Sequence, residues 1–327
     1  MAGGCWLGAG GLFVWHRTWN DLKKEEDIKG YIKFLQESQE VYYLGDFPWV
    51  KYQGALRPAI PIPYEPPQFS LRELENLLET ARVPFLRWWD SFTARETGWW
   101  WLVATPPASF ATLSKKVRNE VRRGLNRCYV EKIKPEFLLE NGYEVYLSAF
   151  KRYRYTKGLD RETYTSLLEQ KEKFPFFEFW GVFAEEKLIG YCECIILART
   201  ATTSVIKYHP DYLNRQYSPG YLLIWTIIDH YLNERNFRLV INGERSIAHD
   251  TNIQEFLERK FGFTRLHCRL NILYSFPLRL CLKVAFPLRN ILKAAQALFP
   301  KNTLIHKTNV LLQQEKICRS FYAKATF

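Results

Sequence analysis

The order of strand-like and helix-like segments over residues 178–274 restricts the fold of this chain most. Short apolar runs, rich in β-branched and aromatic residues and separated by turns, predict strands over 178–184, 188–198 and 202–208. The segments after them predict, in order, an apolar helix over 221–234, a strand over 238–242, a helix over 251–260 and a strand over 266–274. This alternation predicts an α/β fold in which helices flank a sheet.

The first third of the chain predicts elements of the same kinds. Ser70 and Glu73 form a capping-box pattern at the start of a helix that we expect over residues 70–82. Residues 99–104 predict a buried strand. A helix from about Ala111 has an apolar residue at every fourth position and cationic residues on its other faces. The length of 327 residues allows about two domains, at ~150 residues each.

The positive charge of the chain is concentrated in two segments. Lys and Arg number 46 and Asp and Glu number 34, so the net charge is +12. Residues 115–134 hold eight basic and two acidic residues (+6), and residues 269–327 hold ten basic and one acidic residue (+9). Such concentrations favour an anionic partner, which we expect to be nucleic acid, a phosphorylated cofactor or an acidic membrane.

The cysteines and the apolar segments bear on the location of the protein. Seven cysteines occur without a CxxC pair, so we expect reduced, structural thiols and no metal site. Residues 1–15 are apolar and glycine-rich but lack a basic start, and we expect no cleaved signal there. No apolar run is long enough to span a membrane. These features predict a cytoplasmic protein.

The loop before the helix at 221–234 carries the clearest chemical signal. Arg215, Ser218 and Gly220 follow the spacing R-x-x-S-x-G directly before that helix. A helix start leaves backbone N–H groups without partners inside the helix, and its dipole adds positive potential there. Phosphate binding is the natural use of such a loop. An ordinary structural turn is the alternative interpretation.

This arrangement resembles the GNAT acyltransferase superfamily, in which a loop at this place holds the diphosphate of acyl-CoA. The YHPDY of residues 208–212 and the SPGYLL of residues 218–223 resemble a divergent branch of it. That branch contains cellulose-biosynthesis-type acetyltransferases and Fem-type peptidoglycan aminoacyltransferases. The resemblance implies a GNAT-like mixed sheet in two tandem halves. We expect a degenerate N-terminal half over 1–135, a catalytic half over 136–274 and a basic amphipathic helical tail over 275–327.

The resemblance also implies the donor and its contacts. Acyl-CoA, with acetyl-CoA foremost, would place its phosphates on the loop and the start of the helix, without a metal. The cofactor-binding candidates are therefore Arg215, Ser218, Gly220 and Tyr221.

The predicted catalytic residues follow the strand at 238–242. His249 is the first candidate for the base that deprotonates the acceptor, because imidazole titrates near neutral pH, and Glu244 is the second. Glu193 is a third candidate, since it lies on the strand face opposite to its two cysteine neighbours. Arg245 and Asn252 are candidates for substrate binding. The alternative is structural, with Asp250 or Thr251 capping a helix and Arg245 in an ordinary salt bridge.

The segment over 275–299 predicts a cationic amphipathic helix that Pro287 kinks. Its basic and polar residues fall on one arc of the helix, and its other residues are apolar. An anionic membrane surface suits this pattern. Packing of the apolar face on the catalytic domain and contact with tRNA remain alternatives.

These observations together predict an N- or O-acyltransferase. It would move an acyl group from acyl-CoA to an amine or hydroxyl of a sugar, lipid or amino-acid derivative, including cell-envelope precursors, in the cytoplasm or at the inner face of the membrane. The first alternative is a Fem-like transferase that uses aminoacyl-tRNA. The second is a non-catalytic GNAT-like module that binds polyanions or membranes.

Overall fold

The computed structural model describes residues 17–151, 153, 156–214, 216–247 and 252–323, together with two short strands, β1 (Trp6–Leu7) and β2 (Phe13–Val14). The chain forms two compact units that interleave in sequence. Unit 1 consists of Met1–Trp101, Glu244–Asp250 and Arg265–Phe327, and unit 2 of Leu102–Gly243 and Thr251–Thr264. The domain boundaries expected at residues 135 and 274 stay a prediction.

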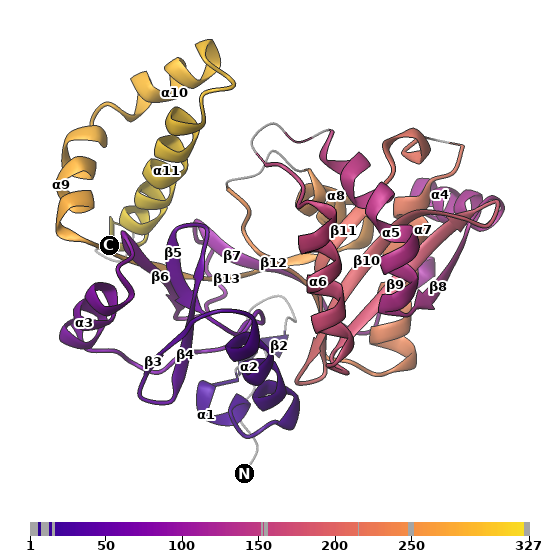
Figure 1. Cartoon of the computed structure of the whole chain (residues 1–327), viewed down its shortest axis with the longest axis horizontal. Coiled ribbons are helices and arrows are strands. Elements are labelled where there is room, and N and C mark those ends of the chain that lie inside the picture. The colour runs from indigo at the N-terminus through magenta and orange to yellow at the C-terminus, as the bar shows by residue number, and fades with distance from the viewer. Residues whose placement is uncertain are drawn as a thin grey trace. The chain divides into compact units, whose positions relative to one another are not determined.

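Unit 2 contains a mixed sheet in the order β12-β11-β10-β9-β8 (Figure 1). Strands β11 and β12 are parallel, and the other neighbours are antiparallel. Its elements are α4 (Lys115–Leu125), β8 (Tyr129–Ile133), α5 (Pro135–Phe150), α6 (Arg161–Glu172), β9 (Phe177–Ala184), β10 (Lys187–Leu197), β11 (Thr200–Tyr208), α7 (Pro219–Ile228), β12 (Leu239–Glu244) and α8 (Ile253–Phe261). The predicted strands and helices of this region are all present, with ends shifted by a few residues.

Tight turns connect the three consecutive strands of this sheet. Glu185 and Glu186 both have positive φ, at 50° and 64°, and join β9 to β10. Ala198 and Arg199, at 50° and 59°, join β10 to β11 in the same way. Two residues with positive φ are typical of type I′ turns, whose twist matches that of paired strands. Each pair of strands is therefore closed by a two-residue turn.

Helices α4 and α7 pack closely against each other. A Cβ on Gly124 of α4 would lie 2.8 Å from Cβ of Leu222 on α7, so the absence of a side chain permits this approach. Helix α4 begins at Lys115 and not near Ala111, because the Ser114 hydroxyl accepts a hydrogen bond from the N–H of Val117 and caps the helix there. The predicted start was therefore several residues early.

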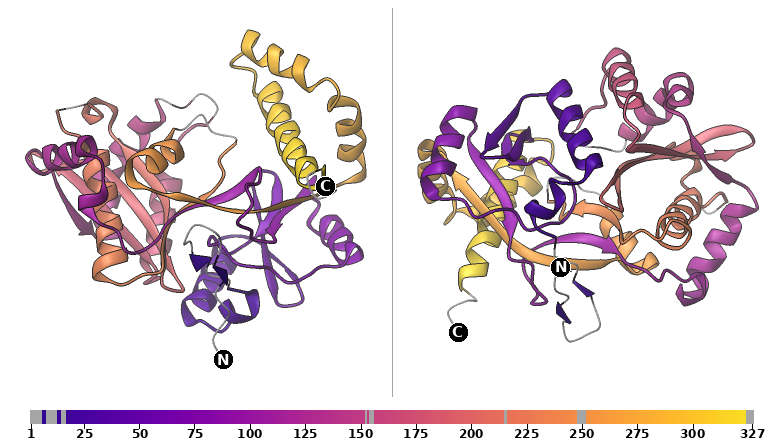
Figure 2. Two further views of the ribbon diagram at one scale, coloured as in Figure 1. Left: turned by 180° about the vertical axis from the view of Figure 1, so that it is seen from behind. Right: turned by 90° about the horizontal axis from the view of Figure 1, so that it is seen from below.

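Unit 1 contains a sheet in the order β3-β4-β5-β6-β13 (Figure 1). Figure 2 shows the ribbon from two further sides, coloured by position in the chain. Its elements are α1 (Trp19–Leu22), α2 (Glu26–Ser38), β3 (Val41–Leu44), β4 (Phe47–Tyr52), β5 (Ala55–Pro58), α3 (Leu71–Ala81), β6 (Phe85–Asp90), the first part of β7 (Trp99–Ala104), β13 (Thr264–Tyr274), α9 (Phe276–Ala285), α10 (Arg289–Leu298) and α11 (Thr303–Ala323). The Ser70 and Glu73 capping box at the start of α3 is confirmed. Large aromatic side chains fill the core, among them Trp49, Trp89 and Trp101.

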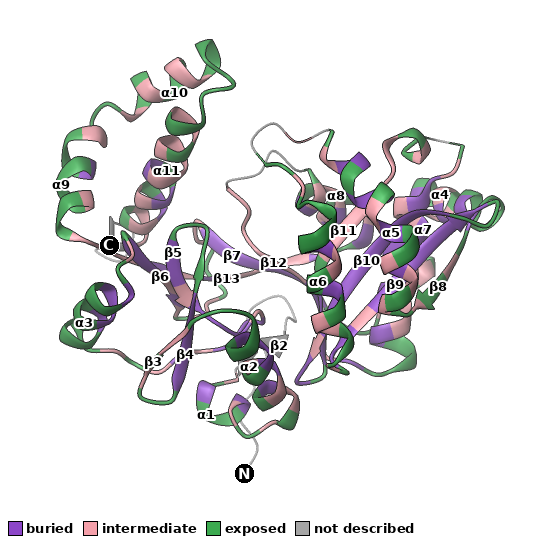
Figure 3. Cartoon of the chain, in the orientation of Figure 1, coloured by how far each residue is buried: buried purple, intermediate pink, exposed green. Residues whose placement is uncertain are grey.

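The basic tail consists of three helices. The predicted kink at Pro287 separates α9 from α10, and α11 follows within the range predicted as a helical tail. Leu312, Gln314 and Ile317 of α11 are buried. Most of α9 and α10 is exposed or half-buried (Figure 3). Helix α11 therefore provides most of the buried residues of the tail, and Leu282 of α9 is buried as well.

Candidate functional site

Strands β11 and β12 diverge within unit 2. They pair in parallel from Thr200 opposite Leu239 to Thr202 opposite Ile241, and β11 then continues to Tyr208. Side-chain hydrogen bonds link the two strands where their backbone pairing ends. The Thr203 hydroxyl donates to the carbonyl of Ile241 at 3.1 Å and accepts from the Asn242 amide at 2.9 Å. The part of β11 after Thr203 therefore has backbone groups that no longer belong to the β12 ladder.

The start of α7 holds the predicted phosphate loop. Ser218 has a left-handed backbone (φ 46°), and Pro219 takes the first helical position. The Ser218 hydroxyl donates to Oε2 of Glu120 on α4 at 2.6 Å, and Arg123 also contacts that carboxylate at 2.8 Å. The hydroxyl of Ser218 thus ties the loop to α4. At this helix start the N–H groups of Ser218 and Tyr221 donate to the carbonyls of Asn214 and Ser218, and Pro219 has no N–H. The N–H of Gly220 is therefore the natural backbone donor for an anion.

Gly220 and Tyr221 pack inside this region. A Cβ on Gly220 would lie 3.6 Å from the ring of Tyr208 at the end of β11. The Tyr221 ring lies 5.0 Å from that of Phe256 on α8, and burial raises the pKa of its hydroxyl. The loop, the end of β11 and α8 therefore lie side by side in unit 2.

Two predicted residues lie outside the described part of the chain. Arg215, the first candidate for the phosphate contact, and His249, the first candidate for the base, both belong to the undescribed residues. Their roles stay predictions.

Glu193 is buried on the α6 side of the sheet. Its Oε2 accepts from Nζ of Lys171 on α6 at 2.5 Å, and its Oε1 accepts from the Ser204 hydroxyl at 2.7 Å. The predicted face is confirmed, because Cys192 and Cys194 are buried with their Sγ atoms 3.8 Å apart. Both carboxylate oxygens of Glu193 therefore have partners, which suits a positioning role more than proton transfer.

Glu244 and Arg245 belong to unit 1. Glu244 is nearly fully buried, with Oε1 3.1 Å from Nη1 of Arg57 and Oε2 3.9 Å from Nη2 of Arg87. Burial lowers the pKa of Arg87, with Glu244 opposing that effect. The Arg245 guanidinium donates to the carbonyl of Gly98 at 2.6 Å. The ion pairs of Glu244 and this bond of Arg245 give both residues structural partners.

Asn252 belongs to unit 2 and precedes α8. It is exposed, and its carbonyl accepts the first helical hydrogen bond, from Phe256 at 2.8 Å. The structure thus groups Ser218, Gly220, Tyr221, Glu193 and Asn252 in one unit, and Glu244 with Arg245 in the other.

Sequence reasoning missed Lys207 on β11. Its Nζ lies 4.2 Å from the ring centre of Phe150, 4.8 Å from that of Tyr153 and 5.8 Å from that of Tyr146. Burial lowers the pKa of this amine to about 8. A lysine directly after the apolar Val205 and Ile206, near the end of the strand, was the one available signal for it.

Neither a metal centre nor a spanning helix is found in the described part of the chain. No group of three or more His, Cys, Asp or Glu residues there could hold a metal ion. Within the same residues, each helix is too short or too polar to cross a bilayer.

Solved structures resemble this chain in fold. FemX aligns with a TM-score of 0.50 at 9% identity, over 73% of this chain and 89% of its own. The chain has the fold of FemX. The mixed α/β fold and the resemblance to Fem-type proteins are thereby confirmed at the level of the fold.

Other solved structures align less closely. A tandem GNAT protein from the clavulanic acid biosynthesis pathway aligns with a TM-score of 0.48 at 15% identity, over 76% of this chain and 87% of its own. L-PGS from Bacillus licheniformis aligns with a TM-score of 0.42 at 12% identity, over 67% of this chain and 76% of its own. No protein-family profile and no curated protein sequence matches the chain.

Proposed function

We propose that the protein is a transferase that moves an acyl group from a phosphate-bearing donor to an amine or hydroxyl of the acceptor. The observation that carries this proposal is the divergence of β11 from β12 beside the start of α7, in a chain with the fold of FemX. The helix start would hold donor phosphates, and the acyl group would lie along the part of β11 beyond its pairing with β12. Backbone N–H groups there would stabilise the developing oxyanion.

Acyl-CoA is the donor that we propose first. The resemblance of residues 215–220 to the GNAT loop supports it, and Arg215 and the first turn of α7 would bind its diphosphate. The nucleophile of the acceptor would attack the thioester carbonyl and the CoA thiol would leave. His249 stays a proposed proton acceptor for this step. The acceptor class that we propose is a sugar, lipid or amino-acid derivative, such as a cell-envelope precursor.

Aminoacyl-tRNA is the alternative donor, and helix α4 favours it. Lys115, Lys116 and Arg127 of this segment are exposed, and α4 packs directly on α7 next to the proposed donor site. A tRNA bound to α4 through its phosphates would bring its aminoacylated 3′ end toward that site. This alternative predicts RNA binding that weakens steeply as salt rises.

Thermal unfolding with and without donor tests the first proposal. A ligand at about 100 times its Kd stabilises the folded state by ~2.7 kcal/mol. At ~2–4 °C per kcal/mol, acetyl-CoA or a longer acyl-CoA should raise Tm by roughly 5–10 °C. Arg215→Ala should lose the shift, and Arg199→Ala, an exposed arginine before the other end of β11, should keep it. No shift with any acyl-CoA contradicts the CoA proposal, and salt-sensitive binding of aminoacyl-tRNA would then favour the alternative.

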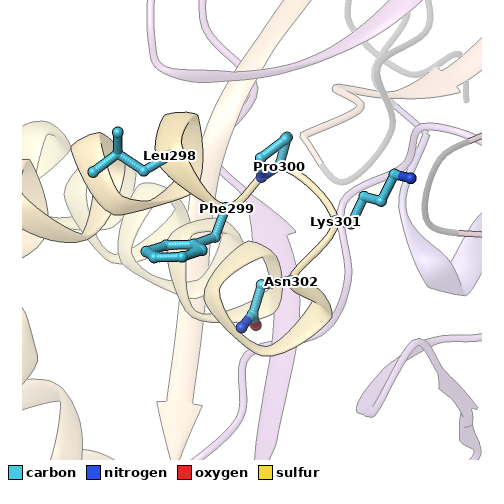
Figure 4. A pocket seen from close by; sticks show the side chains of 5 residues that line it. All are labelled: Leu298, Phe299, Pro300, Lys301 and Asn302. Carbon is cyan, nitrogen blue, oxygen red and sulfur yellow. The ribbon is translucent and has the colours of Figure 1, made fainter.

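We also propose that α9 and α10 bind an anionic membrane surface at the cytoplasmic face. Phe276, Val284, Ile291 and Leu298 are 70%, 66%, 67% and 76% exposed. The cations Arg279, Lys283, Lys293 and Lys301 lie among them and are also exposed, and no acidic residue occurs from residue 264 to residue 314. At the α10–α11 turn, residues 298–302 line a pocket (Figure 4). Exposed apolar and cationic side chains together suit anionic lipid headgroups.

Vesicle sedimentation tests this membrane proposal. The protein should sediment with phosphatidylglycerol-containing vesicles and much less with pure phosphatidylcholine. The double variant Val284→Glu/Ile291→Glu should lose binding, whereas Leu71→Glu, at a residue 61% exposed on α3, should keep it. Equal binding of the double variant and the wild type contradicts a role for this surface.

A further inference from the structure

Lys207 occupies a distinct position on the diverging part of β11. It lies opposite Tyr191 of β10, and its Nζ contacts the rings of Phe150 and Tyr153. The next residue, Tyr208, faces Gly220 of α7. Because side chains alternate along a strand, Lys207 points to the face of the sheet opposite to α7. The amine is therefore on the side of β11 away from the proposed phosphate contacts.

No carboxylate pairs with Lys207 among the described residues, although several titratable groups line the same face. Lys171 of α6, by contrast, pairs with Glu193 of β10, whose other oxygen is used by Ser204. The remaining groups are the tyrosines Tyr146 of α5, Tyr153 after it, Tyr164 of α6 and Tyr191 of β10. Just after the end of β11, Nε2 of His209 also lies 3.9 Å from Oε1 of Glu144 on α5.

Among the lysine and the tyrosines on this face, Lys207 is the group suited to exchange a proton. Burial raises the pKa of Tyr164 to about 12 and raises those of Tyr146 and Tyr191, so these hydroxyls keep their protons. Burial lowers the pKa of Lys207 to about 8. A sizeable neutral fraction of the amine is therefore present in mildly alkaline solution, where a general base works well.

We propose that the neutral amine of Lys207 takes the proton from the acceptor's attacking amine or hydroxyl, which approaches from the α5–α6 side of β11. This inference rests on the proposed transferase function and assigns its base to a residue other than His249. The attacking atom forms a bond to the acyl carbon as its proton moves to Nζ. The carbon–sulfur bond of the thioester breaks, or the ester carbon–oxygen bond of aminoacyl-tRNA. The leaving sulfur or oxygen then takes a proton from the Lys207 ammonium, which restores the amine.

Competitive labelling of the protein by trace acetic anhydride, read by mass spectrometry between pH 6 and 11, tests the state of Lys207 without any assumption about the donor. Labelling of Lys207 should rise with a midpoint near pH 8. Lys187, an exposed lysine on β10, provides the reference labelling curve. A midpoint near 10 for Lys207, or no labelling at any pH, overturns the proposal.

The rate of transfer then tests the step itself. With the donor found by thermal shift, Lys207→Met and Lys207→Arg should both lower kcat by ~100-fold or more and leave donor affinity unchanged. Lys187→Met should leave kcat unchanged. The wild-type rate should rise with a midpoint near pH 8. Rescue by Lys207→Arg would identify an anion contact and overturn the base role. Absence of donor binding in the wild type would instead contradict the proposed function.

Discussion

The buried ion pair of Lys171 and Glu193 allows a quantitative test of the packing between α6 and the sheet. The Lys171 side chain is 17% exposed and that of Glu193 is 6% exposed, and their charged atoms are 2.5 Å apart. Removing one partner of a buried pair leaves the other charge uncompensated, which costs ~3–5 kcal/mol. Because Lys171 retains some contact with water, we expect the lower end of that range, ~3 kcal/mol, for Lys171→Met. At ~2–4 °C per kcal/mol, Tm should fall by roughly 6–12 °C.

A double-mutant cycle checks this value. Lys171→Met, Glu193→Gln and the double variant are compared by thermal unfolding, and the double variant should recover part of the loss because no unpaired charge remains. Lys187→Met is the matched control, since Lys187 and Glu144 form an exposed pair at 3.7 Å and such pairs contribute ~0–1 kcal/mol. A Lys171→Met loss no larger than that of the control would refute the reasoning, as would strict additivity in the cycle.

Three further predictions follow from packing, capping and charge. Gly124→Val should lower stability by ~1–3 kcal/mol, because its side chain meets Leu222 of α7, and urea unfolding beside Leu125→Val, at an exposed neighbour, will measure the difference. Ser70→Ala should cost ~1 kcal/mol by removing the α3 cap, which the unfolding midpoint reports, and Ser70→Asp should restore most of it. Lys207→Met should be more stable than wild type at pH 7. The pKa of Lys207 falls from 10.5 in the unfolded state to about 8 in the folded state, so wild-type stability should rise as the pH rises between those values. The stability advantage of Lys207→Met over the wild type should therefore shrink over that range. An advantage that stays constant with pH would contradict this.

Much of the fold was predictable because local chemistry determines it. Turn residues and β-branched runs mark β9, β10 and β11, and Ser70 with Glu73 marks the start of α3. The start of α4 was misplaced because apolar periodicity continues before the Ser114 cap. A helical tail was predicted over 275–327, but the burial of Leu312 and Ile317 on α11 was not, because these residues gain their partners only in the folded unit.

The site was less predictable, because its side chains acquire their properties from distant segments. Glu193 was placed on the correct strand face, yet its pairing with Lys171 depends on where α6 lies. Lys207 was missed because the rings around its amine come from α5 and from Tyr153, shortly after the end of α5. Both lie more than fifty positions earlier in the chain. Ser218 was predicted for a phosphate loop, and its bond to Glu120 of α4 followed from no local pattern.

Hydrogen–deuterium exchange with and without donor tests the central claim most directly. In the presence of acetyl-CoA or aminoacyl-tRNA, amides in residues 203–208 and 216–222 should exchange more slowly, while those of α3 should be unchanged. Protection in both segments would place the donor between the start of α7 and the part of β11 beyond its pairing with β12. Protection elsewhere, or none with either donor, would contradict the proposed transferase site.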